Sequence, residues 1–396
     1  MTGFTEAPDP RAGALSGVRV VELGSLIAGP FATRILADFG AEVIKVENPE
    51  APDPMRTWGK VTVDGQALWW SVQARNKRLV TIDVKSEEGV ESLLRLIDGV
   101  DVLVENMRPG TLERLGLAPD RLHARNPGLV IARVSGYGQD GPRSHLPGYA
   151  SVAEAASGLR HLNGYPSQPP PRTGISLGDS LGSLYAVQGI LMALYWRDAR
   201  GGRGQVVDVS LVESCFSLLE SAVPDYAATG YVGMPSGSKL DGIAPSNIYR
   251  SRDEQWVVIA ANQDTVFRRL CAVMNRGDLV EDPRFADHRS RGLNQEILDD
   301  MIGQWAALHD ADDLDDLLNL GGVPTSRVND IAAIFADPMF TERGMLVDVP
   351  DERLGTVVHP GIVPKLQRTP GAIRWGGRGV GHDNVEVLGT DAEVGA

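Results

Sequence analysis

Cysteine, long apolar runs and positive charge are all scarce in this chain. Only two of its 396 residues are cysteines, Cys215 and Cys271, too few and too isolated for a disulfide framework or a zinc site. No apolar run approaches the roughly 18 residues that a membrane span needs, and residues 1–14 carry charges instead of an apolar targeting segment. We therefore expect a cytoplasmic protein that does not insert into a membrane.

Acidic residues outnumber basic ones by 52 to 38, which gives a net charge of −14. Such a charge opposes bulk attraction to nucleic acid and to anionic membranes, so neither is an expected partner. The excess is uneven, because residues 1–150 hold 17 basic and 19 acidic side chains. An anionic ligand is therefore expected in the first part of the chain.

The common cofactor motifs are missing as well. The loop at 24–29, after the first predicted strand, lacks the three-glycine spacing that lets backbone approach a dinucleotide pyrophosphate. There is no phosphate-binding P-loop, no G-x-S-x-G nucleophile turn and no H-E-x-x-H zinc helix, and the seven histidines are scattered. We therefore expect no bound metal, nicotinamide or flavin.

What the sequence does contain is a regular alternation of short β-branched runs and amphipathic stretches. Strands are expected at 17–23, 42–46, 79–84, 100–104, 129–134 and 205–210, and helices at 31–39, 87–97, 180–198 and 211–220. Strands that alternate with helices predict an α/β fold with a mainly parallel sheet covered on both faces.

The texture changes after residue 225. Residues 225–245 are rich in Gly and Pro and read as a long loop, which is typical of a lid or a linker. A strand at 256–260 and several short helices follow, and the tail from residue 330 is rich in Gly and Pro with little periodicity. These shifts predict a large domain at 1–225, a small domain at 226–330 and a C-terminal segment at 331–396.

A series of specific strings carries a family resemblance. They are LGSLIAGP (23–30), GAEVIKVE (40–47), NKR (76–78), VENMRPG (104–110), SGYG (135–138), GDS (178–180) and GRGQ (202–205). In this order they resemble the class III CoA-transferase family, which includes formyl-CoA:oxalate, carnitine and dicarboxylate CoA-transferases and the related α-methylacyl-CoA racemases. The similarity runs from about residue 15 to 219 and continues more weakly to 388.

The resemblance implies a Rossmann-like large domain that the C-terminal segment completes, a small α+β domain between them, and a homodimer of two interlocked chains. The implied substrates are a coenzyme A thioester as acyl-CoA donor and a free carboxylic acid, with no bound cofactor. Asp179 matches the family's catalytic aspartate. The positions that match its CoA contacts are Ile27, Ala28, Ile82, Asp83, Val84, Lys85, Asn106, Met107, Arg108, Arg114, Ser135, Gly136, Tyr137 and Gly138.

Two further regions match by position. Trp58 lies in a segment that resembles a wall on the substrate side, and Gly233 and Gly237 lie in the loop at 233–242, our candidate lid.

Several of the candidate residues also have a purely structural interpretation. Asp179 directly precedes the predicted helix at 180–198, where Asp is a favoured N-cap. Arg108 and Arg114 fit solvated surface charges, Tyr137 fits core packing, and Lys77 and Arg78 fit structural or solvated positions.

An aspartate suits CoA transfer between carboxylic acids. Attack by a carboxylate on an acyl-CoA gives a mixed anhydride, which keeps about as much transfer potential as the thioester. A serine ester would lie several kcal/mol lower and trap the acyl group. We expect the thiolate then to form an aspartyl-CoA thioester that the acceptor acid attacks, and we expect the site to exclude water, which would hydrolyse the anhydride.

A few residues distinguish a transferase from a racemase and one transferase subgroup from another. Racemisation needs two opposed bases, and Tyr149 stands where the racemases carry a histidine, so the racemase is the runner-up and a protein that only binds CoA esters comes third. Ile27 and Asn48 replace a glutamine and an arginine of the formyl-CoA:oxalate pattern. Instead, residues 175–180, 242–247 and 267–270 resemble the subgroup that moves CoA from succinyl-CoA to malate or citramalate. We therefore expect succinyl-CoA as donor and a dicarboxylate as acceptor.

Overall fold

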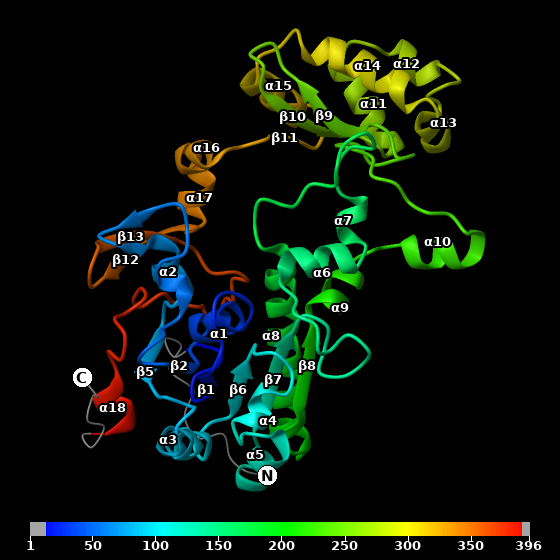
Figure 1. Ribbon diagram of the computed structural model, residues 1–396. Helices are drawn as coiled ribbons and strands as arrows, with labels where there is room; N and C mark the ends of the chain where they lie inside the picture. The colour runs from blue at the N-terminus through cyan, green and yellow to red at the C-terminus, as the bar shows by residue number, and fades with distance from the viewer. Residues whose placement is uncertain (1–12, 390–396) are drawn as a thin grey trace. The chain divides into compact units, whose positions relative to one another are not determined.

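The computed structural model describes residues 13–389 (Figure 1). Within them the chain forms two compact units. The large unit comprises the residues up to Leu159, Thr173–Val223 and the residues from Met339 onward, and the small unit comprises Arg160–Arg172 and Pro224–Pro338. Beside the small domain predicted at 226–330, the small unit is longer at both ends and also takes in 160–172.

The large unit is built on a sheet of six strands in the order β5-β2-β1-β6-β7-β8. The strands are β1 (Arg19–Glu22), β2 (Glu42–Glu47), β5 (Lys77–Thr81), β6 (Val102–Glu105), β7 (Val130–Ser135) and β8 (Val206–Ser210). Every neighbouring pair in this sheet is parallel. The predicted α/β class with a central parallel sheet is thereby confirmed.

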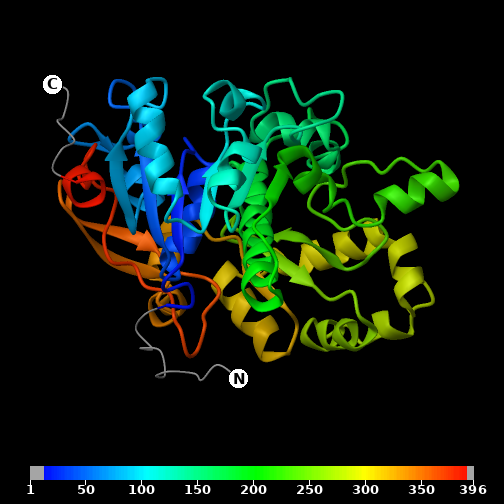
Figure 2. The same ribbon diagram turned by 90° about the horizontal axis from the view of Figure 1, so that it is seen from below.

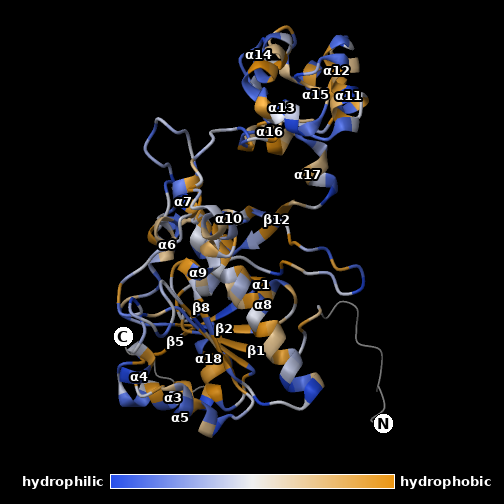
Figure 3. Cartoon of the chain, turned by 90° about the vertical axis from the view of Figure 1, so that its right-hand side faces the viewer, coloured by the Kyte–Doolittle hydropathy of each residue, from blue (hydrophilic) through white to orange (hydrophobic). Residues whose placement is uncertain are grey.

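Successive residues of the central strands face opposite layers of helices, as the two-residue period of a strand requires. One layer contains α1 (Ala28–Asp38) and α8 (Leu177–Arg200), and the other contains α3 (Glu87–Ile97), α4 (Thr111–Arg114) and α5 (Pro119–Arg125). Val20 and Val102 pack in the first layer, and Val21 and Leu103 in the second. Apolar side chains therefore pack on both faces of the sheet, and its strands stand out as hydrophobic in Figure 3.

Helix α8 corrects one expectation from the sequence. By length and composition alone it is apolar enough to cross a membrane, so the expectation that no apolar run approaches that length is wrong here. In the large unit α8 packs against α1, β7 and β8, and it buries Ala186, Ile190 and Ala193. One face of α8 thus belongs to the core of the large unit.

The C-terminal residues return to the large unit beside β5, the edge strand of the sheet (Figure 2). Asp383 Oδ2 accepts a hydrogen bond from the Leu79 N–H at 2.7 Å, and Asn384 Oδ1 accepts one from the Thr81 N–H at 2.8 Å. These side chains occupy backbone donors that an exposed edge would leave open to another strand. The string at 381–384, for which the sequence suggested no role, therefore covers the edge strand β5 of the sheet.

The small unit has its own core. An antiparallel sheet of β9 (Ser246–Arg250), β10 (Trp256–Ala260) and β11 (Thr325–Arg327) packs with α11 (Asp264–Val273), α14 (Gln295–Ala306) and α15 (Ala311–Leu320). Buried members of this core include Tyr249, Val257, Phe267 and Leu298. The strand predicted at 256–260 is confirmed, whereas β9 and β11 lie in stretches for which no strand was expected.

Two stretches hold more structure than the sequence suggested. Helix α10 extends into the predicted loop at 225–245, and the tail from 330 contains the helices α16, α17 and α18 and the hairpin of β12 and β13. The remaining elements are η1 (Pro54–Arg56), β3 (Thr62–Val63), β4 (Gln66–Ala67), α2 (Leu68–Gln73), α6 (Ala150–Ala156), α7 (Leu159–Leu162), α9 (Leu211–Phe216), α10 (Ala222–Thr229), α12 (Asp278–Glu281), α13 (His288–Leu293), α16 (Ile331–Ala336), α17 (Pro338–Glu342), β12 (Leu346–Asp351), β13 (Gly355–Pro360) and α18 (Asn384–Leu388).

Candidate active site

The sheet offers a crevice where its strand order reverses, between β1 and β6. Ligands of open parallel sheets bind outside the carboxyl ends of the strands at such a point. The loops that follow β1 and β6 are tied together by Asn106, a predicted CoA contact. Its Oδ1 accepts from the Ser25 N–H and its Nδ2 donates to the Ser25 carbonyl, each at 2.9 Å.

A pocket of about 250 Å³ opens at the carboxyl ends of these strands. The predicted CoA contacts Ile82, Val84 and Met107 all line it. Its other lining residues are Leu23, Gly24, Ser25, Lys45, Val46, Glu47, Asn48, Ala51, Pro52, Asp53 and Pro54. The structure therefore brings Ile82 and Val84 together with Met107, which lies 25 positions after Ile82 in the sequence, beside the loop that follows β1.

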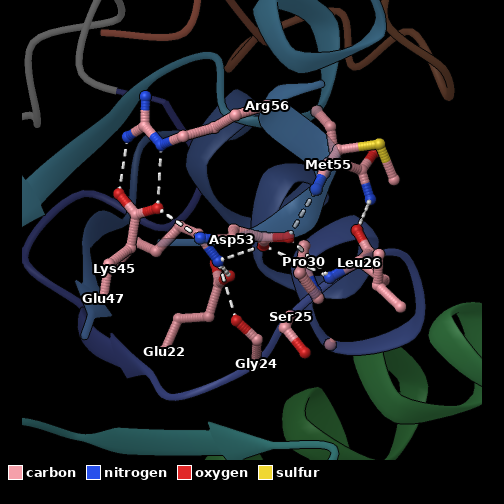
Figure 4. Close-up of polar contacts among 12 residues, drawn as sticks. Glu22, Gly24, Ser25, Leu26, Pro30, Lys45, Glu47, Asp53, Met55 and Arg56 are labelled. Atoms are coloured by element: carbon pink, nitrogen blue, oxygen red, sulfur yellow. Dashed lines mark hydrogen bonds and ion pairs between the residues drawn. The ribbon is translucent and has the colours of Figure 1, made fainter. Parts of the chain in front are cut away.

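The loop after β1 is held in a strained shape (Figure 4). Leu26 has a φ of 63°, a left-handed conformation that is unfavourable for a residue other than glycine. Both carboxylate oxygens of Asp53 accept from the Leu26 N–H, at 3.1 and 3.2 Å, and Gln73 Nε2 donates to the Ile27 carbonyl at 3.1 Å. Side chains from two other segments thus set the backbone at Ile27, a predicted CoA contact.

A buried ion network of Glu22, Lys45, Lys77 and Asp53 lies beneath this loop. The Glu22 carboxylate is 2.7 Å from Lys45 Nζ and 2.8 Å from Lys77 Nζ, and Lys45 Nζ is 2.9 Å from Asp53. Lys45 also donates to the Gly24 carbonyl at 2.7 Å. Removing one partner of a buried pair costs about 3–5 kcal/mol, so the network fixes the start of the loop firmly.

The pKa shifts in this network favour the charged forms of Glu22 and Lys45 but not that of Lys77. Burial raises the pKa of Glu22, but its two ammonium partners lower that pKa by more, so the carboxylate stays ionised. Burial also acts against the charge of Lys45, yet Glu22 and Asp53 together hold its pKa above the ordinary value. Lys77 faces Glu22 and is repelled by Lys45, so burial leaves its pKa below the ordinary value.

Asp179 lies in the first turn of α8, which begins at Leu177. The expectation that it caps the helix is wrong, because Ser176 holds the N-cap position, and the Gly178 N–H in the first turn donates to Glu154 Oε1 at 3.1 Å. The Asp179 carboxylate instead accepts a hydrogen bond from the backbone N–H of Ala150, the first residue of α6. The start of one helix thus supports the candidate nucleophile on another.

The surroundings of Asp179 raise the pKa of its carboxyl group but leave that pKa below neutral pH. Burial raises the pKa of Asp179 from 3.8 to about 6, repulsion from Glu154 adds to the rise, and the Ala150 N–H acts against it. At neutral pH the carboxylate is therefore ionised, yet more basic than an ordinary aspartate. A carboxylate of this kind is suited to nucleophilic attack.

The turn that carries Asp179 is joined to the loop after β1. Ser183 Oγ lies 2.7 Å from both the Ala28 carbonyl and the Asp179 carbonyl. A Cβ added at Gly178 would come within 2.9 Å of the Ala150 carbonyl oxygen, so glycine permits the close approach of α6 and α8. The structure thus links Ala28, a predicted CoA contact, to Asp179 through a single hydroxyl.

Three predicted contacts are exposed cations, Lys85, Arg108 and Arg114. Arg114 donates to Thr111 Oγ1 at 2.8 Å, whereas Lys85 and Arg108 have no ion-pair partner within residues 13–389. The predicted contact Asp83 accepts from the Lys85 N–H at 3.1 Å and so helps to form the turn before α3. Charges at the carboxyl ends of strands suit phosphates, and their contact with CoA stays a prediction.

The string at 135–138 begins with the last residue of β7. A Cβ at Gly136 would come within 2.8 Å of the Gly148 Cα, and Gly138 has a φ of 89°, so both glycines have backbone reasons to be there. Tyr137 is partly buried beside Gly148. The buried Ser135 hydroxyl finds no hydrogen-bond partner among the described residues, so Ser135 has a polar atom to offer a ligand.

The substrate wall and the lid stay predictions. Trp58 is 47% exposed and stacks on Trp69 with ring centroids 6.4 Å apart. Gly233 and Gly237 belong to the small unit, where Gly237 has a φ of 75°. Tyr149, at the position where the resemblance expects a histidine for a racemase, is the N-cap residue of α6.

Sequence reasoning missed Glu154, Ser183 and the carboxylates of the ion network. Glu154 is one polar residue in the Ala-rich stretch ASVAEAAS (150–157), and no spacing indicates that its helix meets the start of α8. Lys77, expected to be structural or solvated, is structural. Within the described part of the chain, no group of three or more His, Cys, Asp or Glu side chains is placed to hold a metal ion.

Similarity to known proteins extends over most of the chain. The model of CoA-transferase family III matches residues 15–384. The chain is 46% identical to the succinyl-CoA–D-citramalate CoA-transferase of Chloroflexus aurantiacus, over 94% of this chain and 93% of that protein, and 39% identical to the α subunit of a succinyl-CoA–L-malate CoA-transferase of the same organism, over 94% and 88%. A crystal structure of a CaiB/BaiF family protein from Brucella suis superposes with a TM-score of 0.83 at 32% identity, over 95% of this chain and 98% of that one.

Proposed function

Because the chain belongs to CoA-transferase family III, and is therefore a transferase, we propose that it moves coenzyme A from succinyl-CoA to a dicarboxylic acid. Two of the similar proteins are named for succinyl-CoA as donor and for the dicarboxylates citramalate and malate as acceptors. The observation that carries the proposal is Asp179, a basic carboxylate joined through Ser183 to the loop of the crevice.

The proposed reaction has four steps. An Asp179 oxygen attacks the acyl carbon of succinyl-CoA, the C–S bond breaks, and a succinyl–aspartyl anhydride and the CoA thiolate result. The thiolate attacks the aspartyl carbon and releases succinate, which leaves an aspartyl-CoA thioester. The acceptor carboxylate then attacks this thioester and displaces the thiolate. Finally the thiolate attacks the acceptor's acyl carbon, which yields the new acyl-CoA and restores Asp179.

The residues around Asp179 serve this sequence. The Ala150 N–H holds the carboxylate in place, and burial keeps it basic enough to attack. Exposed Arg108 and Lys85 are the proposed partners of the CoA phosphates, since cations bind phosphate groups. Tyr149 in place of a histidine gives no second base for proton exchange at an α-carbon, so a racemase is not favoured.

We further propose that the enzyme works as an interlocked homodimer in the cytoplasm. Helix α8 supports the dimer, because large apolar side chains on it are exposed in the single chain, as surfaces buried between subunits are. These side chains are Leu184, Leu191, Met192, Tyr195 and Trp196. The proposed interface rests on them and on family membership.

The substrate proposal is tested by incubating the enzyme with succinyl-CoA and a panel of acids. The panel contains citramalate, malate, glutarate, oxalate and monocarboxylic acids, and the CoA products are identified by mass. We expect new thioesters of the dicarboxylates that carry a chain of four or five carbons. Products from oxalate or from monocarboxylates alone would contradict the proposed acceptor class.

A further inference from the structure

Glu154 is a buried carboxylate that the proposed reaction has not used. It lies on α6, is only 3% exposed, and forms no ion pair within residues 13–389. A buried charge without a cation is costly to a fold. Its charge also acts directly on Asp179, the proposed nucleophile. No cation among the described residues offsets that cost.

Hydrogen bonds join the two carboxylates in a reciprocal arrangement. Glu154 Oε1 accepts from the Gly178 N–H, in the first turn of α8, at 3.1 Å. The Asp179 carboxylate in turn accepts from the Ala150 N–H, in the first turn of α6. Each helix thus offers a backbone donor to the carboxylate of the other. Glu154 thereby fixes the turn that carries Asp179.

The other elements packed around this pair add no charge to it. Helix α9 presents Cys215, and burial raises the pKa of that thiol to about 11, with both carboxylates adding to the rise, so the thiol stays neutral. Helix α1 and strands β7 and β8 present Ala28, Val134 and Val209, which are apolar. Among the described residues, Glu154 is therefore the charged group that acts on Asp179.

We propose that Glu154 is a positioning residue for Asp179, which it holds through the first turn of α8 and whose negative charge it repels until the acyl group is attached. Acylation removes the charge of Asp179 and so relieves the repulsion, which favours the covalent adduct over the free carboxylate. This inference rests on the proposed function of Asp179 as the acyl carrier.

The test compares Glu154→Gln, which keeps the hydrogen bond to Gly178 and removes the charge, with the wild type. In the variant we expect the acid limb of the kcat/KM profile to move to lower pH by about one unit. We also expect the adduct fraction in the steady state, trapped with hydroxylamine at Asp179, to fall several-fold. Because the substitution removes an unpaired buried charge, the variant should unfold at a higher temperature than the wild type.

Two further variants make each outcome decisive. Glu154→Asp keeps the charge, so its acid limb should stay within a few tenths of a unit of the wild type, and an equal shift in both variants would overturn the role of charge. A Glu154→Gln enzyme with an unchanged pH profile and adduct fraction, or with a lower unfolding temperature, would overturn the inference. Turnover by Asp179→Ala would instead overturn the proposed function itself.

Discussion

At the scale of single residues, Asp179 shows a conflict between stability and reactivity. Its pKa is raised from 3.8 to about 6 in the folded protein. Between these values the folded state holds more protons than the unfolded state, so stability falls as pH rises from about 4 to about 6 and the loss is constant above. The ionised carboxylate that the reaction needs therefore lowers the stability of the folded state at neutral pH.

The first prediction follows from this loss of stability when Asp179 ionises. Asp179→Asn should abolish turnover, because an amide cannot form the anhydride, and should keep the hydrogen bond from Ala150. At pH 7 it should stabilise the protein by on the order of 1–2 kcal/mol, after allowance for the solvent that reaches this partly exposed group. Thermal unfolding of both proteins between pH 4 and pH 7 measures the difference, which should vanish near pH 4.

The activity of the unaltered enzyme supplies a second prediction at this scale. Since only the ionised carboxylate attacks, kcat/KM should fall about tenfold per pH unit below about pH 6. Initial rates with succinyl-CoA across pH 4.5 to 8 measure this, with unfolding checked at each pH by circular dichroism. A rate that stayed level down to pH 5 would show that Asp179 does not titrate in the rate-limiting step.

Sequence reasoning reached some of these residues and not others. Asp179 and Met107 were found because they lie in recognisable strings, and Ile82 and Val84 because their positions match CoA contacts of the family. Glu154 lies outside every such string. Its partner Gly178 is 24 positions away, and only the packing of α6 on α8 makes them neighbours.

At the scale of elements, the close approach of α6 and α8 places Asp179. We predict that Gly178→Ala will separate the two helix starts, because a Cβ there would lie 2.9 Å from the Ala150 carbonyl oxygen. Overpacking of this kind costs about 1–3 kcal/mol, and kcat should fall by at least tenfold. Gly174→Ala is the matched control, since a Cβ at Gly174 meets nothing within 4 Å. Equal rates for the two variants would contradict this placement.

The elements themselves were predictable to different degrees. The helix at 87–97 and the strand at 256–260 have the predicted bounds, because strong amphipathic or β-branched patterns mark them. The hairpin of β12 and β13 was missed, because Pro350 and Pro360 interrupt its alternation. The start of α8 was placed three residues late, at Ser180 instead of Leu177.

At the scale of the whole molecule, the proposed dimer accounts for the exposed apolar side of α8. We predict that Met192→Asp, at a side chain 60% exposed, will weaken dimerisation because the charge would be buried between subunits. Light scattering coupled to size exclusion measures the mass. Leu320→Asp is the matched control at a 90% exposed apolar residue of the small unit. A variant at Met192 that keeps the mass of the wild type would argue against this face.

The sequence predicted the class of fold and the order of its parts but not how the C-terminal segment is attached. Asp383 and Asn384 bind the edge strand β5 through side chains, and hydrogen bonds of that kind leave no periodic trace in a sequence. Shifts in composition predicted the order of the domains, and the resemblance implied that the C-terminal segment completes the large one.

The covalent role of Asp179 is tested most directly by oxygen transfer from the acceptor acid. Trypsin releases residues 173–197, a peptide in which Asp179 is the single carboxylic side chain. When the acceptor carries ¹⁸O in its carboxyl group, its bridging oxygen should remain on Asp179 after turnover, and this peptide should gain 2 Da, whereas the peptide from enzyme without succinyl-CoA should not. Full turnover with no label in this peptide would contradict the anhydride route.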